Sequence, residues 1–146
     1  MLAGMALWLQ LLAATLLIIL VTLIHGTGVV ITTKLFKHDD RHLKGRKLAF
    51  REFRLMVPMA LCLFGLHAVE ISVFAAFYFA FAQAGTFADA LYASASAYTT
   101  LGIAEGALGQ WRLVGVFEGL AGFLLIGWSA AVFVTDMEKI LRDWKP

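Results

Sequence analysis

The chain has 146 residues, of which 61% are hydrophobic, and its mean hydropathy is +0.82. Only 15% of the residues are charged, and the net charge is +2. A soluble domain of this length cannot bury so much apolar surface, so the composition excludes a soluble enzyme or nucleic-acid-binding domain and predicts one domain in lipid. The single cysteine, Cys62, excludes an intrachain disulfide and is expected to be a small buried hydrophobic residue.

The N-terminal segment, residues 1–36, is predicted to form the first transmembrane helix. Its first 33 residues contain no Lys, Arg, Asp or Glu. A secretory signal would carry positive charge before a shorter apolar core. About 20 apolar residues cross a bilayer, and the span is expected from about Leu7 to Leu35.

Basic residues follow this span. The stretch Lys34–Arg54 contains eight of the twelve Lys and Arg residues. Because basic loops stay on the cytoplasmic side of the plasma (inner) membrane, residues 37–54 are predicted to be a cytoplasmic loop. The tail, residues 136–146, is placed on the same side, and the N-terminus outside. The basic cluster either binds anionic lipids or only sets this topology.

Two more spans are expected, from about Leu55 to Gln83 and from about Trp111 to Thr135, within a pore module of residues 55–135. Pro58 is assigned to the first turn of the second span, where proline is tolerated.

The segment between these two spans is too short to cross the membrane. Thr86 followed by Asp89 predicts a capping box, so a short helix is expected to begin near Phe87, and the glycine-rich sequence "LGIAEGALG" ends it. Non-helical backbone at membrane depth is tolerated only where it lines a wet cavity or is buried in protein. The predicted fold is an all-α membrane protein with three transmembrane helices and a re-entrant helix and loop.

One re-entrant segment cannot enclose a pore, so a homo-oligomeric ring is expected. The C-terminal end of the short helix carries partial negative charge and would favour cations in the centre of the ring. Backbone carbonyls after Thr99 would replace the hydration shell of a cation. The residues alone predict a cation pore.

The sequence "TFADALYASASAYTTLG", with the glycine-bearing helix after it, resembles the pore module of the potassium channel superfamily. The chain is similar to small bacterial ion-channel proteins that add one N-terminal helix to this module. The resemblance implies a homotetramer with a selectivity filter, which in the family reads Thr-Val-Gly-Tyr-Gly-Asp. The implied filter residues are Thr99, Thr100, Leu101, Gly102, Ile103, Ala104 and Glu105.

The second half of this filter departs from the family pattern. Ile103 stands at the tyrosine position and cannot donate a hydrogen bond, while Ala104 replaces a glycine and resists positive φ by about 1 kcal/mol. Four copies of Glu105 would form an acidic ring that attracts monovalent or divalent cations. The sequence therefore predicts a non-selective or divalent-permeable channel. A potassium-selective channel and a non-conducting subunit that kept the pore fold remain as alternatives.

Four ionisable residues lie within the predicted spans. His67 and Glu70 share one helix face and, with His25, form either a proton- or metal-sensitive contact behind the filter or a hydrogen-bonded group that fixes helix packing. Their spacing matches no recognised zinc motif. Glu118 either supports the pore loop or faces the permeation path.

Glycines in the third span have two interpretations. Gly119, Gly122 and Gly127 are candidate hinges for a gate, whereas the GxxxG pair of Gly115 and Gly119 predicts close helix packing. No nucleophile or metal motif accompanies the acidic and basic residues, so the chain is not expected to be an enzyme. No cofactor is expected besides the permeant cations.

Overall fold

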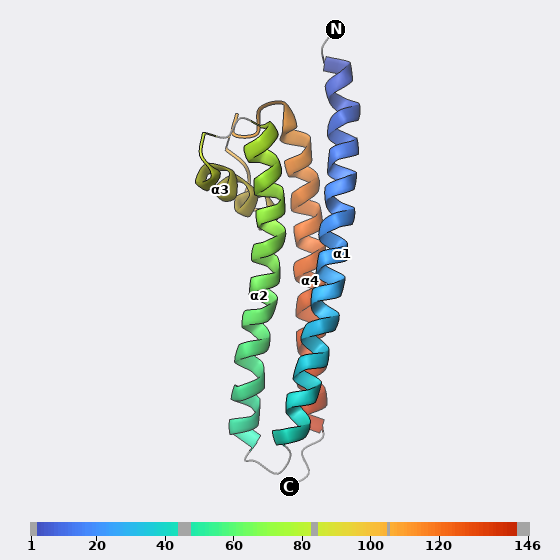
Figure 1. Cartoon of the computed structure of the whole chain (residues 1–146), viewed down its shortest axis with the longest axis vertical. Helices are drawn as coiled ribbons and strands as arrows, with labels where there is room; N and C mark the ends of the chain where they lie inside the picture. The colour runs from blue at the N-terminus through green and yellow to red at the C-terminus, as the bar shows by residue number, and fades with distance from the viewer. Residues whose placement is uncertain (1–2, 44–47, 83–84, 105, 143–146) are drawn as a thin grey trace.

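The computed structural model describes residues 3–43, 48–82, 85–104 and 106–142. Three long helices lie side by side, and a short helix, α3, lies beside the end of the bundle from which α1 starts (Figure 1). The helices are α1 (Ala3–Leu43), α2 (Leu48–Phe81), α3 (Phe87–Tyr98) and α4 (Arg112–Arg142), and the 3-10 turn η1 (Gly109–Trp111) precedes α4.

The fold is all-helical within the described residues, as the sequence predicted. Three helical stretches are long and apolar enough to cross a membrane: Leu7–Phe36, Phe53–Phe81 and Gly109–Lys139. Their outer faces expose large apolar side chains such as Phe64 and Phe123. A surface of this kind is stable against lipid, so the chain is a multi-pass membrane protein.

The helices extend further into the basic stretch than expected. α1 continues to Leu43 and α2 begins at Leu48, so most of the predicted loop at residues 37–54 has helical backbone. The stretch contains no proline and one glycine, Gly45, and its charged residues are compatible with helix. The basic residues mark where the apolar spans end, and the helical backbone of α1 and α2 continues beyond those points.

Two smaller predictions about α2 were wrong. Pro58 lies inside the helix and not in its first turn, because α2 begins earlier than expected. Cys62 is exposed on the surface of the single chain.

The main core joins α3 to α2 and α4, and α1 packs on the same two long helices. Val21 of α1, Phe74 of α2, Ala90 of α3 and Val114 of α4 are all fully buried there. α1 and α2 also approach closely at Gly28, where an added Cβ would lie 2.5 Å from a methyl of Leu66. This core fixes the position of α3 relative to the bundle.

Candidate functional site

The first turn of α3 is held by a reciprocal cap. The Asp89 backbone N–H donates to Thr86 Oγ1 over 3.1 Å, and the Thr86 N–H donates to Asp89 Oδ2 over 2.9 Å. Thr86 has extended backbone, with φ −131° and ψ 163°. These two reciprocal hydrogen bonds define a capping box, and they confirm that the short helix begins at Phe87.

Backbone N–H groups beyond the C-terminus of α3 donate back to carbonyls of its last turn. Thr100 donates to the Ala97 carbonyl over 2.9 Å, and Leu101 donates to the Ser96 carbonyl over 3.0 Å. This is the Schellman pattern, which places its C′ residue in the left-handed region. That residue is Thr100, with φ +60°. Because the left-handed region costs a non-glycine residue about 1–2 kcal/mol, the surrounding contacts must hold Thr100 in place.

The residues after this turn face away from the core, with one exception. Leu101 is 84% exposed, and Thr99, Thr100 and Gly102 are exposed too. Ile103 instead packs against α4, where its Cδ1 lies 2.4 Å from the position of a Cβ added to Gly115. The position that the family fills with tyrosine therefore anchors this loop through apolar contact.

An open hollow of about 860 Å³ lies between this loop and the first half of α4. Ala104, which replaces a family glycine, has no positive φ, whereas Gly102 has a φ of +103°. Glu105, the predicted acidic ring, lies outside the described residues. The walls of the hollow include Thr100, Gly102 and Ile103 from the loop and Gly119, Leu120 and Phe123 from α4.

Glu118 joins three helices behind the loop. It is fully buried, and its two carboxylate oxygens accept from the Tyr78 hydroxyl over 2.6 Å and from the Ser94 hydroxyl over 2.5 Å. Tyr78 lies on α2 and Ser94 on α3, while Glu118 lies on α4. The carboxylate thus supports the short helix, and its partners are hydroxyl groups rather than backbone N–H groups of the glycine-rich loop.

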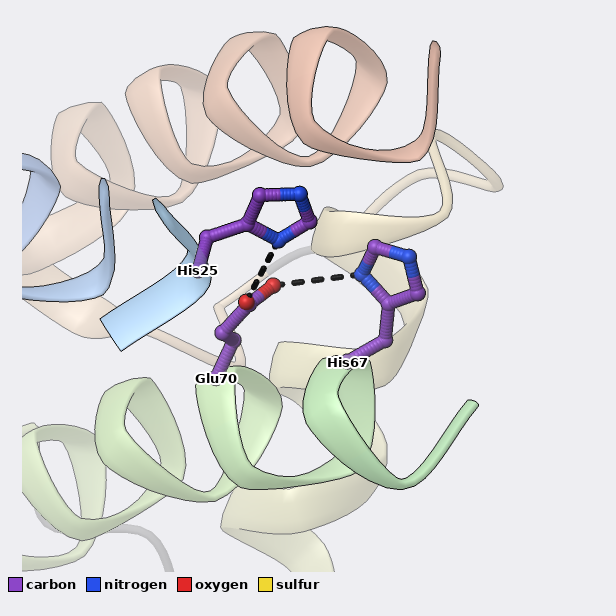
Figure 2. A group of neighbouring side chains, drawn as sticks. All are labelled: His25, His67 and Glu70. Carbon is purple, nitrogen blue, oxygen red and sulfur yellow. Dashed lines mark hydrogen bonds and ion pairs between the residues drawn. The ribbon is translucent and has the colours of Figure 1, made fainter. Parts of the chain in front are cut away.

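Glu70 forms a second junction, shown in Figure 2. His25 Nδ1 lies 2.8 Å from Glu70 Oε1, and His67 Nδ1 lies 3.2 Å from Oε2. The Tyr98 hydroxyl donates to Glu70 Oε2 and lies 2.8 Å from His67 Nδ1. His25 and Glu70 are fully buried. The group ties α1 and α2 to the last residue of α3.

The region that contains these features matches a known family. A sequence model described as "Ion channel", of the potassium-channel-like two-transmembrane type, matches residues 66–139, just over half of the chain. The chain belongs to this ion channel family. Comparisons with curated proteins and with solved structures found no match. Family membership indicates transport, not catalysis, as the function of this channel protein.

The channel's α4 glycines differ in what surrounds them. A Cβ at Gly122 would lie 2.2 Å from the Tyr98 carbonyl oxygen, and one at Gly119 would lie 3.0 Å from the Ala97 oxygen. Gly127 has no neighbour within 4 Å of such an atom. α4 runs as one helix through all of them. Gly119 and Gly122 therefore let the end of α3 approach α4, whereas Gly127 has no such packing role.

Sequence reasoning named both buried carboxylates of the channel but missed their hydroxyl partners. Ser94 and Tyr98 are four residues apart and thus lie on one face of α3, which is the face that meets Glu118 and Glu70. The spacing of these two hydroxyl side chains by one helical turn was the available signal.

Proposed function

We propose that the channel is a homotetrameric cation channel of relaxed or divalent-leaning selectivity. The observation that carries the proposal is the state of the loop after α3. Among the described residues, the backbone carbonyls of residues 99–103 accept no hydrogen bond. Carbonyl oxygens without other partners are the groups with which channel filters replace a cation's hydration shell.

The electrostatics of α3 support a cation as the permeant ion. The helix ends at Tyr98, directly before this loop, and the C-terminal end of a helix carries about half a negative charge. An anion would meet this negative helix end without compensation.

A ring of four chains accounts for the exposed loop. One chain presents its loop beside an open hollow that Phe123 lines, and Leu101 of the loop is exposed. A single chain cannot enclose a pore, whereas rotational copies place four such loops around one axis. In this arrangement α3 is a re-entrant pore helix, the N-terminus lies outside, and the basic stretch Lys34–Arg54 lies in the cytoplasm of the plasma membrane.

The altered filter supports weak discrimination between cations. The strict family filter continues beyond Gly102 with a tyrosine and a second glycine, whereas Ile103 and Ala104 stand at these positions here. Ala104 does not take the positive φ that glycine permits, so we expect fewer consecutive carbonyl sites, and Glu105 follows them in the sequence. Carboxylate oxygens favour hard divalent cations, so four copies of Glu105 would concentrate Ca²⁺ or Mg²⁺ at the outer mouth.

Reversal potentials test the proposal. Planar bilayers that contain the purified protein would have a K⁺ solution on one side and a Na⁺ solution on the other. In a second experiment, a Ca²⁺ or Mg²⁺ solution would replace the Na⁺ solution. We expect reversal near zero for K⁺ against Na⁺, and reduced divalent current in Glu105→Gln but not in Glu138→Gln, which removes an exposed charge near the end of α4. Reversal at the K⁺ equilibrium potential would show a potassium-selective channel. Absence of current in every solution would show a non-conducting subunit.

A further inference from the structure

Three metal-binding side chains converge behind the pore helix. His25 comes from α1, and His67 and Glu70 come from α2, as Figure 2 shows. One ligand atom of each residue lies within 4.8 Å of the other two. Carboxylates and imidazoles at this separation are unusual inside a membrane protein, where ionisable groups are costly and mark functional positions.

The donor set fits one chemical class of ion. Two imidazoles and one carboxylate form the three-residue ligand set of many zinc sites. Bonds of about 2.0–2.2 Å in a tetrahedral site separate neighbouring ligand atoms by about 3.3 Å. The distances here are 2.8 Å from His25 Nδ1 to Glu70 Oε1 and 3.2 Å from His67 Nδ1 to Oε2. Because the three ligand atoms all lie within 4.8 Å of one another, side-chain movements of about 1.5 Å or less would bring each pair to the tetrahedral spacing. Ca²⁺ and Mg²⁺, which take oxygen ligands, do not fit.

The surroundings supply the outer contacts that such a site needs. A ligating histidine generally donates its other ring N–H to a neighbour. His25 Nε2 faces the buried Ser129 Oγ at 3.5 Å. When Nδ1 binds the ion, the ring proton moves to Nε2, from which it can donate to Ser129. The change is a tautomer shift and needs no other reactant.

His67 gives access to the cluster. Its side chain is 15% exposed and lines a hollow of about 490 Å³ between α2 and α4. Thr99, the first filter residue, lines the same hollow, and so do Tyr98 and Ser129. Among the three ligands, His67 is the one that borders this hollow.

We propose that His25, His67 and Glu70 bind a zinc-class divalent transition-metal ion that regulates the filter. Glu70 Oε2 now accepts the Tyr98 hydroxyl. A metal ion bound to Glu70 and His67 competes for that oxygen and releases Tyr98. Tyr98 ends α3 and directly precedes Thr99 and Thr100, so its release loosens the start of the filter. The binding site stands on geometry alone, and its effect on conduction rests on the proposed channel function.

Cobalt absorption tests the site without any current measurement. Co²⁺ in a tetrahedral site absorbs strongly in the visible range, and Zn²⁺ displaces it. With the purified full chain in detergent, we expect one Co²⁺ per chain, and at least tenfold weaker binding in His25→Gln and in His67→Gln. Ser72→Ala is the matched control, because its hydroxyl donates to the Ala68 carbonyl of its own helix. Size-exclusion chromatography would verify that each variant is folded, and His67→Gln is the milder change because its side chain is partly exposed.

The possible results test the metal site and its effect on conduction independently. Absence of Co²⁺ absorption, or unchanged binding in both histidine variants, would overturn the proposed site. Binding that leaves wild-type currents unchanged would overturn the coupling to Tyr98. Zn²⁺-dependent currents in the wild type that are lost in His25→Gln would support both. A chain that never conducts would refute the proposed function, while the absorption measurement would still decide the site.

Discussion

Gly122 is the position where one added methyl group should most disturb the channel. A Cβ at this position would lie 2.2 Å from the Tyr98 carbonyl oxygen and 2.9 Å from its carbonyl carbon. Ordinary carbon–oxygen contacts are about 3.3 Å or longer. Gly122→Ala therefore forces the end of α3 and α4 about 1 Å apart. The carbonyl oxygen and carbon of Tyr98 belong to the backbone, so no side-chain rotation can relieve the overlap with them.

The expected cost follows from this overlap. Overpacking of a well-packed core costs about 1–3 kcal/mol, and the replacement of a helical glycine by alanine returns about 1 kcal/mol. Gly127→Ala is the matched control in the same helix, because nothing lies within 4 Å of its added Cβ. Gly127→Ala should therefore show only the gain in stability that alanine gives over glycine in a helix. The two variants should thus differ by about 1–3 kcal/mol per chain, with Gly122→Ala the less stable.

Denaturant unfolding of both variants in detergent micelles, followed by circular dichroism, measures this difference. Single-channel recording then separates packing from gating. We expect Gly122→Ala to change permeation because the proposed filter begins one residue after Tyr98. Equal stability of the two variants would refute the close approach of α3 to α4. Reduced opening in Gly127→Ala alone would favour a hinge at that glycine.

Three further variants test the support of the pore helix. Tyr98→Phe removes a hydroxyl donor from buried Glu70, so we expect about 1–3 kcal/mol lower stability in micelle unfolding and an altered K⁺/Na⁺ permeability ratio. Glu118→Ala should destabilise the fold more than Glu118→Gln, because glutamine keeps an acceptor for the two buried hydroxyls. Thr86→Ala should cost about 1 kcal/mol and speed hydrogen exchange in the first turn of α3, whereas Thr15→Ala, whose hydroxyl bonds within α1, should not.

Specific results would contradict each of these expectations. An unchanged permeability ratio in Tyr98→Phe would show that the hydrogen bond from Tyr98 to Glu70 does not influence permeation. Equal unfolding of the two Glu118 variants would mean that the buried hydroxyls find other partners. Equal exchange rates in Thr86→Ala and the wild type would show that the capping box does not hold the helix end.

The features that the sequence predicted well were local. Three apolar spans and the cap formed by Thr86 and Asp89 depend on residues within one helix or one turn. Helix ends in the basic stretch were misplaced because hydropathy reports where lipid contact ends, whereas helices continue through charged residues. The left-handed Thr100 was not predicted, because a β-branched residue is disfavoured there and Gly102 is the expected position for positive φ.

The candidate site depends on distances between helices, which no local pattern encodes. Glu70 and Glu118 stood out as acidic residues in apolar spans. Their partners lie 24 to 45 residues away along the chain, with His67 as the exception at three. Which hydroxyl meets which carboxylate follows from the register of α3 against α2 and α4, and that register emerges only when the core is packed.

The junction at Glu70 has a consequence for how the chain divides into units. The family match begins at residue 66, well after α1 ends. His25 Nδ1 of α1 nevertheless lies 2.8 Å from one oxygen of Glu70, whose other oxygen accepts from Tyr98, the last residue of α3. Removal of α1 would leave a buried carboxylate without one of its partners, at a cost of about 1–3 kcal/mol. The N-terminal helix therefore supplies a buried polar contact to the region that matches the channel family.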